Sequence, residues 1–95
     1  MITTKQRATL RGYANKLDVI LHIGKSGVTE AVIAQAKDAL VAREMIKGKV
    51  QDNALLTARE VAAEIAEATG ADIVQVIGSK FVLYKQNPKN PIYEI

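Results

Sequence analysis

The stretch at residues 23–30, Ile-Gly-Lys-Ser-Gly-Val-Thr-Glu, constrains the fold of this chain more than any other. An apolar run at 19–23 leads into it, and apolar residues at helical spacing follow it. Gly24 and Gly27 bracket a lysine and a serine at the junction, where the chain has to turn. The local order is therefore strand, turn and helix, a unit typical of α/β folds.

This junction has the features of a phosphate-binding site. Glycine lets a ligand approach the backbone closely, and a helix start presents unpaired N–H groups and the positive end of its dipole. We expect Gly24 and Gly27 to shape the loop, Lys25 to pair with a phosphate and Ser26 to donate a hydrogen bond. An ordinary turn is the alternative, because Gly-x-x-Gly is a short pattern. A nucleotide-binding P-loop is excluded, because Val19 stands where its first glycine would be.

The rest of the chain divides into helices and strands with clear boundaries. Helices are predicted at 3–14, where Thr3 and Gln6 form a capping box, from a Thr29 N-cap to about residue 43, and between a capping box at Thr57 and Glu60 and a terminal glycine, Gly70. Strands are predicted at 19–23, 45–51, 73–77 and 81–85, with a hairpin turn at Gly78-Ser79.

The apolar pattern also predicts which side chains face the core. In the first strand Ile20 and His22 should point away from the face that carries Val19, Leu21 and Ile23. In the second strand Lys47 and Lys49 should point away from Ile46, Gly48 and Val50. The residues expected to face inward from the second and third helices are Val32, Ile33, Ala36, Ala39, Leu40, Val61, Ile65 and Ala68.

The element order is α-β-α-β-α-β-β. Helical crossovers predict parallel pairing among the early strands, and the closing hairpin adds an antiparallel strand. The sequence thus predicts one α/β domain over residues 1–95, with a mixed four-stranded sheet and helices packed on it. Its core should occupy 4–85, and Pro88 and Pro91 predict an extended tail over 86–95. The order of the strands within the sheet is not predicted.

Charge is unevenly distributed along the chain, although the net charge is only +3. The first quarter of the chain contains a single acidic residue, Asp18. Its basic residues are Lys5, Arg7, Arg11, Lys16 and Lys25. The segment 60–72 is acidic and holds no basic residue. A basic end suits an anionic polymer. A solvated basic face without a partner is the alternative.

Several classes of site lack the residues that they need. The chain has no cysteine and one histidine, His22, so neither a disulfide framework nor a Cys/His metal cluster can form. Glu60, Glu64 and Glu67 are predicted to be solvated on the third helix, and no base is evident for Ser26. We therefore expect no enzyme activity, cofactor, metal or small-molecule substrate. Without a membrane span or a signal peptide, a cytoplasmic protein with no membrane partner is expected.

Nucleic acid is the partner that the remaining residues favour. Lys25, Arg7, Arg11, Lys47 and Lys49 could converge if the first helix and the second strand both neighbour the glycine loop. Aromatic residues are scarce, and Phe81 and Tyr84 lie on opposite faces of the last strand, so only one of them can point outward. A stacking surface of the RRM type is therefore disfavoured, and structured RNA read through its backbone is favoured.

An ordered set of motifs then resembles a known family. These are Gln6-Arg7-x-x-Leu10-Arg11, Ile23-Gly24-Lys25-Ser26-Gly27-Val28-Thr29, Glu44-Met45-Ile46-Lys47-Gly48-Lys49, Val76-Ile77-Gly78 and Leu83-Tyr84. They resemble the CRM domain (chloroplast RNA splicing and ribosome maturation) in its bacterial single-domain form, often called YhbY, over residues 4–85. The family commonly has proline where this chain has Val19, and a bulkier apolar residue where it has Gly48.

The resemblance implies a fold similar to the C-terminal domain of translation initiation factor 3. It also implies RNA binding through the glycine loop and association with precursors of the large ribosomal subunit. We therefore expect an RNA-binding assembly factor whose partner is ribosomal RNA. An adaptor that docks a basic protein through the acidic third helix is the alternative. The RNA sequence and the oligomeric state stay open.

Overall fold

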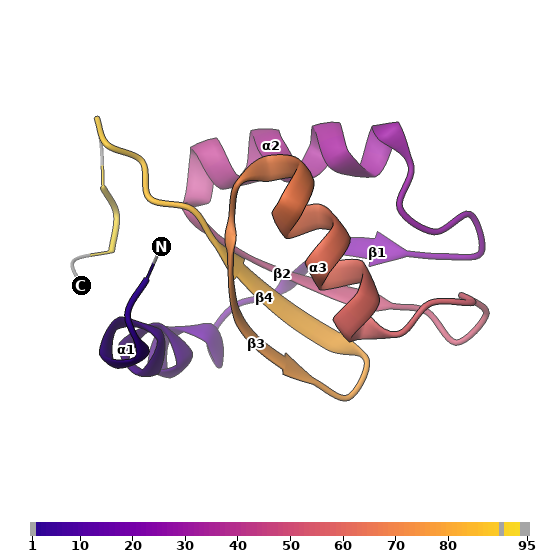
Figure 1. The fold of residues 1–95 in the computed structure, drawn as a ribbon, viewed down its shortest axis with the longest axis horizontal. Coiled ribbons are helices and arrows are strands. Elements are labelled where there is room, and N and C mark those ends of the chain that lie inside the picture. Colours follow the sequence, from indigo (N-terminus) through magenta and orange to yellow (C-terminus); the bar gives the residue numbers. More distant parts are fainter. Residues whose placement is uncertain (1, 90, 94–95) are drawn as a thin grey trace.

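The computed structural model describes residues 2–89 and 91–93, and it has the predicted element order (Figure 1). The elements are α1 (Thr4–Ala14), β1 (Val19–Ile23), α2 (Glu30–Arg43), β2 (Met45–Val50), α3 (Ala58–Thr69), β3 (Asp72–Ile77) and β4 (Lys80–Tyr84). The prediction of a mixed α/β domain with one four-stranded sheet is confirmed. No helix in the described ranges has the length and apolar character that crossing a bilayer requires.

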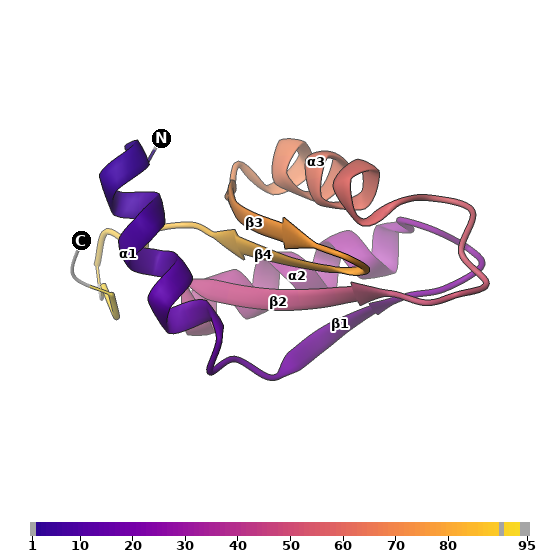
Figure 2. The same cartoon turned by 90° about the horizontal axis from the view of Figure 1, so that it is seen from below.

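The sheet has the strand order β1-β2-β4-β3. β1 runs parallel to β2, as predicted, whereas β4 is antiparallel to both of its neighbours, β2 and β3. The last strand is thus inserted between β2 and β3. Helices α2 and α3 cover one face of the sheet, and α1 crosses the other face at one end only (Figure 2).

Each helix begins where its sequence allows a cap. Thr3 with Gln6 and Thr57 with Glu60 form complete capping boxes, and the Thr29 hydroxyl accepts from the N–H of Val32. Such caps each contribute about 1 kcal/mol to helix stability. Gly70 ends α3 with φ 79, a left-handed conformation that glycine adopts without steric cost. These local interactions explain why the predicted boundaries of the helices are correct to within a residue.

Two clusters of buried side chains hold the layers together. The larger lies between the sheet and helices α2 and α3, and the smaller lies between the sheet and α1, around Leu10 and Tyr84. Strict alternation fails at Ile20, which packs against the larger cluster beside Leu21, because the register of β1 shifts there. The prediction that Ala68 faces inward is also wrong: Ala68 is exposed, while Ala62 and Thr69 of the same helix are buried.

Both aromatic residues of β4 are buried. Phe81 lies in the larger cluster and Tyr84 in the smaller one, on opposite faces as predicted. Neither points outward, because α2 and α3 cover the face that carries Phe81, and α1 and the tail cover the face that carries Tyr84. The Phe81 ring lies directly over Gly48 of β2, where a Cβ would overlap it. The phenylalanine thus fills the space that a side chain at position 48 would take.

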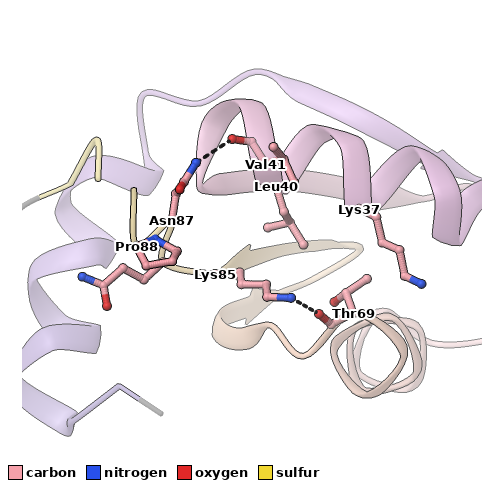
Figure 3. A pocket seen from close by; sticks show the side chains of 8 residues that line it. Lys37, Leu40, Val41, Thr69, Lys85, Asn87 and Pro88 are labelled. Carbon is pink, nitrogen blue, oxygen red and sulfur yellow. Dashed lines mark hydrogen bonds between the residues drawn. The ribbon is translucent and has the colours of Figure 1, made fainter. Parts of the chain in front are cut away.

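The C-terminal tail turns back toward α1 rather than leaving the domain. Asn87 reaches the end of α2, where its Nδ2 donates to the carbonyl of Val41 at 3.3 Å (Figure 3). Tyr93 packs against Tyr13 and Tyr84, with ring centroids 5.3 and 6.4 Å apart. The described part of the tail has neither helix nor strand, and residues 90, 94 and 95 lie outside the described residues.

Glu44 is the residue that fastens this tail. It joins α2 to β2 with φ 61, and its side chain is buried. Its carboxylate accepts from the backbone N–H groups of Asn87 and Ile92, both at 2.6 Å, and of Tyr93 at 2.9 Å. Burial by itself raises the pKa of the Glu44 carboxyl, but these three donors outweigh burial and hold the pKa below its ordinary value.

Candidate nucleic-acid interface

The glycine loop forms a tight turn at the carboxyl end of β1. The N–H of Gly27 donates to the carbonyl of Gly24 at 3.0 Å, which closes a four-residue turn with Lys25 and Ser26 exposed at its tip. Gly27 has φ 70, so the backbone itself requires a glycine there. The turn leads directly to Thr29, the N-cap of α2.

Gly24 differs from Gly27, because nothing inside the molecule requires it to be glycine. Its φ is not positive, and a Cβ built on it would meet no atom within 4 Å. The missing side chain therefore leaves open space in front of the backbone. A group that approaches from outside, such as a phosphate, would use this space.

A second loop and a hairpin turn lie beside the glycine loop at the same end of the sheet (Figure 2). The N–H of Gln51 donates to the carbonyl of Ile23, and a Cβ on Gly27 would lie 3.5 Å from Leu56. The N–H of Val50 donates to the carbonyl of Ser79 in the hairpin turn. We name this region, made of residues 24–29, 51–57 and 78–79, the loop end. Helices α2 and α3 both begin here, so two positive dipole ends lie close to the loop.

The sheet face that α1 leaves uncovered is basic. Lys47 and Lys49 of β2 point to this face, as predicted, and Lys80 of β4 lies directly opposite Lys49. No hydrogen bond or ion pair to another described residue engages these three side chains. Like charges directly opposite one another on a sheet are unfavourable, so an anion above them would relieve their repulsion. We name this surface, made of His22, Lys47, Lys49 and Lys80, the open face.

Lys80 was missed by the sequence-based reasoning. Alternation along β4 places Lys80 on the face opposite Phe81, and that signal was available. Its position beside Lys49 depends on the insertion of β4 between β2 and β3, which no local pattern announces.

The two arginines of α1 do not join the glycine loop. Arg7 is half-buried, and its Nε donates to the carbonyl of Ile73 in β3 at 3.1 Å, so it also ties α1 to the edge of the sheet. Arg11 is exposed. Because α1 lies at the end of the sheet away from the loop end (Figure 2), both arginines form a separate basic region. The condition for convergence of all five cations, that the first helix neighbours the glycine loop, is therefore not met.

His22 makes a polar contact with the residue that follows β2. Its Nδ1 lies 3.1 Å from Nε2 of Gln51 at the loop end of the open face. Within the described ranges, no three His, Cys, Asp or Glu side chains come together as a metal site would require. The side chains of His22 and Gln51 thus join β1 to the residue that follows β2.

The fold and this surface define a small α/β protein with a basic, glycine-containing end. Residues 2–85 match the CRS1/YhbY (CRM) domain, and the chain belongs to this family. It is 38% identical over 95 residues to "Probable RNA-binding protein YqeI" of Bacillus subtilis, covering all of this chain and 99% of that protein. It is 35% identical to an RNA-binding protein of Haemophilus influenzae, covering 96% of this chain and 92% of the relative.

A solved structure agrees with both the family and the fold. The solution structure of a Staphylococcus aureus protein proposed to bind RNA superposes with a TM-score of 0.84 and 41% sequence identity. The match covers 100% of this chain and 99% of that one. The similarity therefore extends over the whole chain, including the tail that follows the CRM match.

Proposed function

We propose that this protein binds structured RNA by its sugar-phosphate backbone, through the loop end and the open face. The observation that carries the proposal is the glycine loop itself, where open space in front of Gly24 adjoins the exposed Lys25 and Ser26 and the start of α2. The unpaired lysines of the open face extend the positive surface from this loop. Relatives that match 96–100% of the chain are named as RNA-binding or probable RNA-binding proteins, which supports RNA as the partner.

In this proposal the residues have distinct roles. Gly24 and Gly27 shape the loop, Lys25 pairs with a phosphate, and Ser26 and nearby N–H groups donate hydrogen bonds to it. Lys47, Lys49 and Lys80 attract the adjoining backbone, and Arg7 and Arg11 form a second region that a longer RNA can reach. Contacts of this kind hold an RNA in position without reading its bases.

The test is the double substitution Lys25→Asp/Ser26→Asp. Each charge-assisted contact contributes about 1.5–3 kcal/mol, so losing two of them should weaken binding to a structured RNA by roughly 100-fold or more. The melting temperature should stay unchanged, because both side chains are exposed. Fluorescence anisotropy with a labelled RNA stem-loop measures the affinity.

The matched control is Lys37→Asp/Ala34→Asp, which changes the net charge equally on the exposed side of α2. This control should bind RNA nearly as well as the unaltered protein at moderate salt. Equal losses in the two double variants would mean that overall charge, not the loop, holds the RNA. Unchanged affinity in the loop variant would reject the phosphate site.

We further propose that the RNA is ribosomal RNA in cytoplasmic precursors of the large ribosomal subunit. The CRM family relationship supports this role. The alternative is an adaptor that docks a basic protein. The ratio of absorbance at 260 nm to that at 280 nm, measured on protein prepared at low salt, distinguishes RNA binding from this alternative. Co-purified RNA raises the ratio, whereas a protein-like ratio favours an adaptor that docks through Glu64 and Glu67 of α3.

A further inference from the structure

A shallow hollow lies on the open face, between the end of α1 and the strands β2, β3 and β4. The residues that line it are Asn15, Lys47, Gln75, Ile77, Lys80 and Val82. Its volume is about 120 Å³. Sites that enclose whole small molecules measure about 300–1,000 Å³, so this hollow can seat one flat group but cannot enclose a cofactor.

A bulge in β3 brings Gln75 to this hollow. Ile73 pairs with Leu83 and Gln75 pairs with Val82. The chain thus advances two residues along β3 but only one along β4, which leaves one extra residue in β3. Val74 and Gln75 consequently share one face: Val74 is buried under α1, and Gln75 lines the hollow. Bulges often direct a side chain toward a functional site.

The lining is suited to a nucleotide. The side-chain amides of Asn15 and Gln75 make no hydrogen bond to another described residue, so each offers a free donor and a free acceptor. Ile77 is 65% exposed, which leaves an apolar surface beside these amides. Lys47 and Lys80 add two positive charges, and none of the described carboxylates lines the hollow. A neutral, flat group with polar edges that is attached to phosphates fits these three properties together.

We propose that the hollow receives one unpaired nucleotide of the RNA, with its base against Ile77, its edge toward Asn15 and Gln75, and its phosphates near Lys47 and Lys80. This inference rests on the proposed function and adds to it a preference for RNA with an unpaired nucleotide. Lys80 lies opposite Lys49, so a backbone held at the loop end can continue along the open face into the hollow.

The test compares two RNA stem-loops that differ by a single unpaired nucleotide in the stem, with each of the four bases tried in turn. For at least one base, the unaltered protein should bind the bulged stem about 10-fold more tightly than the paired stem. Asn15→Ala/Gln75→Ala and, separately, Ile77→Ser should abolish this preference while affinity for the paired stem stays the same. Gln86→Ala removes an exposed amide beyond β4 and should change neither affinity.

The outcomes separate this inference from the proposed function. Binding of both stems with no preference for any bulge, or a preference that survives in both variants, overturns the nucleotide site and leaves backbone binding intact. Binding of neither stem overturns both. As an independent readout, a photoreactive 4-thiouridine at the bulge should crosslink to β3, and the crosslink should be lost in Ile77→Ser. A crosslink confined to residues that do not line the hollow would also overturn the assignment.

Discussion

Gly48 and Phe81 show how a single position in a strand depends on its cross-strand neighbour. Glycine is unusual inside a strand, and Gly48 also departs from the bulkier apolar residue that the family resemblance leads one to expect there. The structure accounts for the glycine, because the Phe81 ring lies over it and fills the larger cluster from β4. Cross-strand pairs of this kind stabilise sheets as units rather than as separate residues.

Gly48→Val should therefore destabilise the protein by about 1–3 kcal/mol, because the added side chain has to displace a buried ring. Phe81→Leu alone should also destabilise it, by leaving space in the core. The two changes together should cost less than the sum of their separate costs. The valine at position 48 would fill the space that the leucine at position 81 leaves empty. Urea unfolding of the three variants measures this coupling, and additive costs would contradict it.

At the scale of elements, strands β2 and β4 act as one basic surface. Their pairing places Lys49 opposite Lys80, and Lys47 lies two residues before Lys49 in β2, on the same face. None of these charges is offset by an ion pair within the described ranges, so the surface is poised to release counterions when RNA binds.

Each of Lys49→Ala and Lys80→Ala should flatten the slope of log K against log salt by about 0.7–0.9, because each removes about one phosphate contact. Lys37→Ala, on the exposed side of α2, should leave the slope unchanged. Titrations of one RNA stem-loop at several salt concentrations give the slopes. Equal slopes in all three variants would mean that RNA does not cross the open face.

The junction between α2 and β2 is a second element-scale feature, because Glu44 there holds the C-terminal tail. The positive φ of Glu44 strains its backbone, because the residue is not glycine. The three hydrogen bonds that backbone N–H groups donate to its carboxylate offset this strain in the folded protein. Since these bonds lower the pKa of Glu44 in the folded protein, their contribution is present above the pKa of the unfolded carboxyl. This stabilisation is lost as the pH falls through the pKa of Glu44 in the folded protein.

Glu44→Gln should lower the free energy of unfolding by about 1–3 kcal/mol at neutral pH, because hydrogen bonds to a charged acceptor are the stronger ones. The difference from the unaltered protein should shrink as the pH falls below the ordinary pKa of a glutamate and then through the lower pKa of Glu44 in the folded protein, where the wild-type carboxyl becomes protonated. Thermal unfolding across this pH range measures it. Glu64→Gln, at an exposed carboxylate of α3, serves as the control, and a difference independent of pH would exclude a role for the charge.

Over the whole molecule, charge and covering helices divide the surface into distinct regions. The loop end lies away from the tail and the N-terminus, and α1, which carries Arg7 and Arg11, lies at the other end (Figure 2). The open face extends between these two ends, and its Lys47 lies near both the end of α1 and Tyr93 of the tail. Many separate phosphate contacts make binding strong in sum yet easily displaced by salt or by a competing partner. This behaviour suits a factor that occupies an RNA surface only while it is open.

The protein should therefore migrate with precursors of the large ribosomal subunit in a sucrose gradient at low salt and be absent from translating ribosomes. A few-fold increase in salt should release it, since about four phosphate contacts lose roughly two orders of magnitude in affinity over that range. Deleting the gene should cause such precursors to accumulate. Sedimentation only at the top of the gradient, or equally with mature ribosomes, would contradict the assembly role without contradicting RNA binding.

What the sequence determined by itself is local. Caps, alternation and turn glycines act between residues close in the chain, so the element order, the helix boundaries and the position of the glycine loop could all be predicted. The tertiary structure decided the strand order, the two bulges, the separation of Arg7 from the loop end and the role of Glu44. These depend on contacts between distant segments, such as β4 entering between β2 and β3 and the tail reaching back to α2. Such contacts form where two apolar faces can be buried against each other. A pattern that extends over only a few residues does not specify which faces will meet.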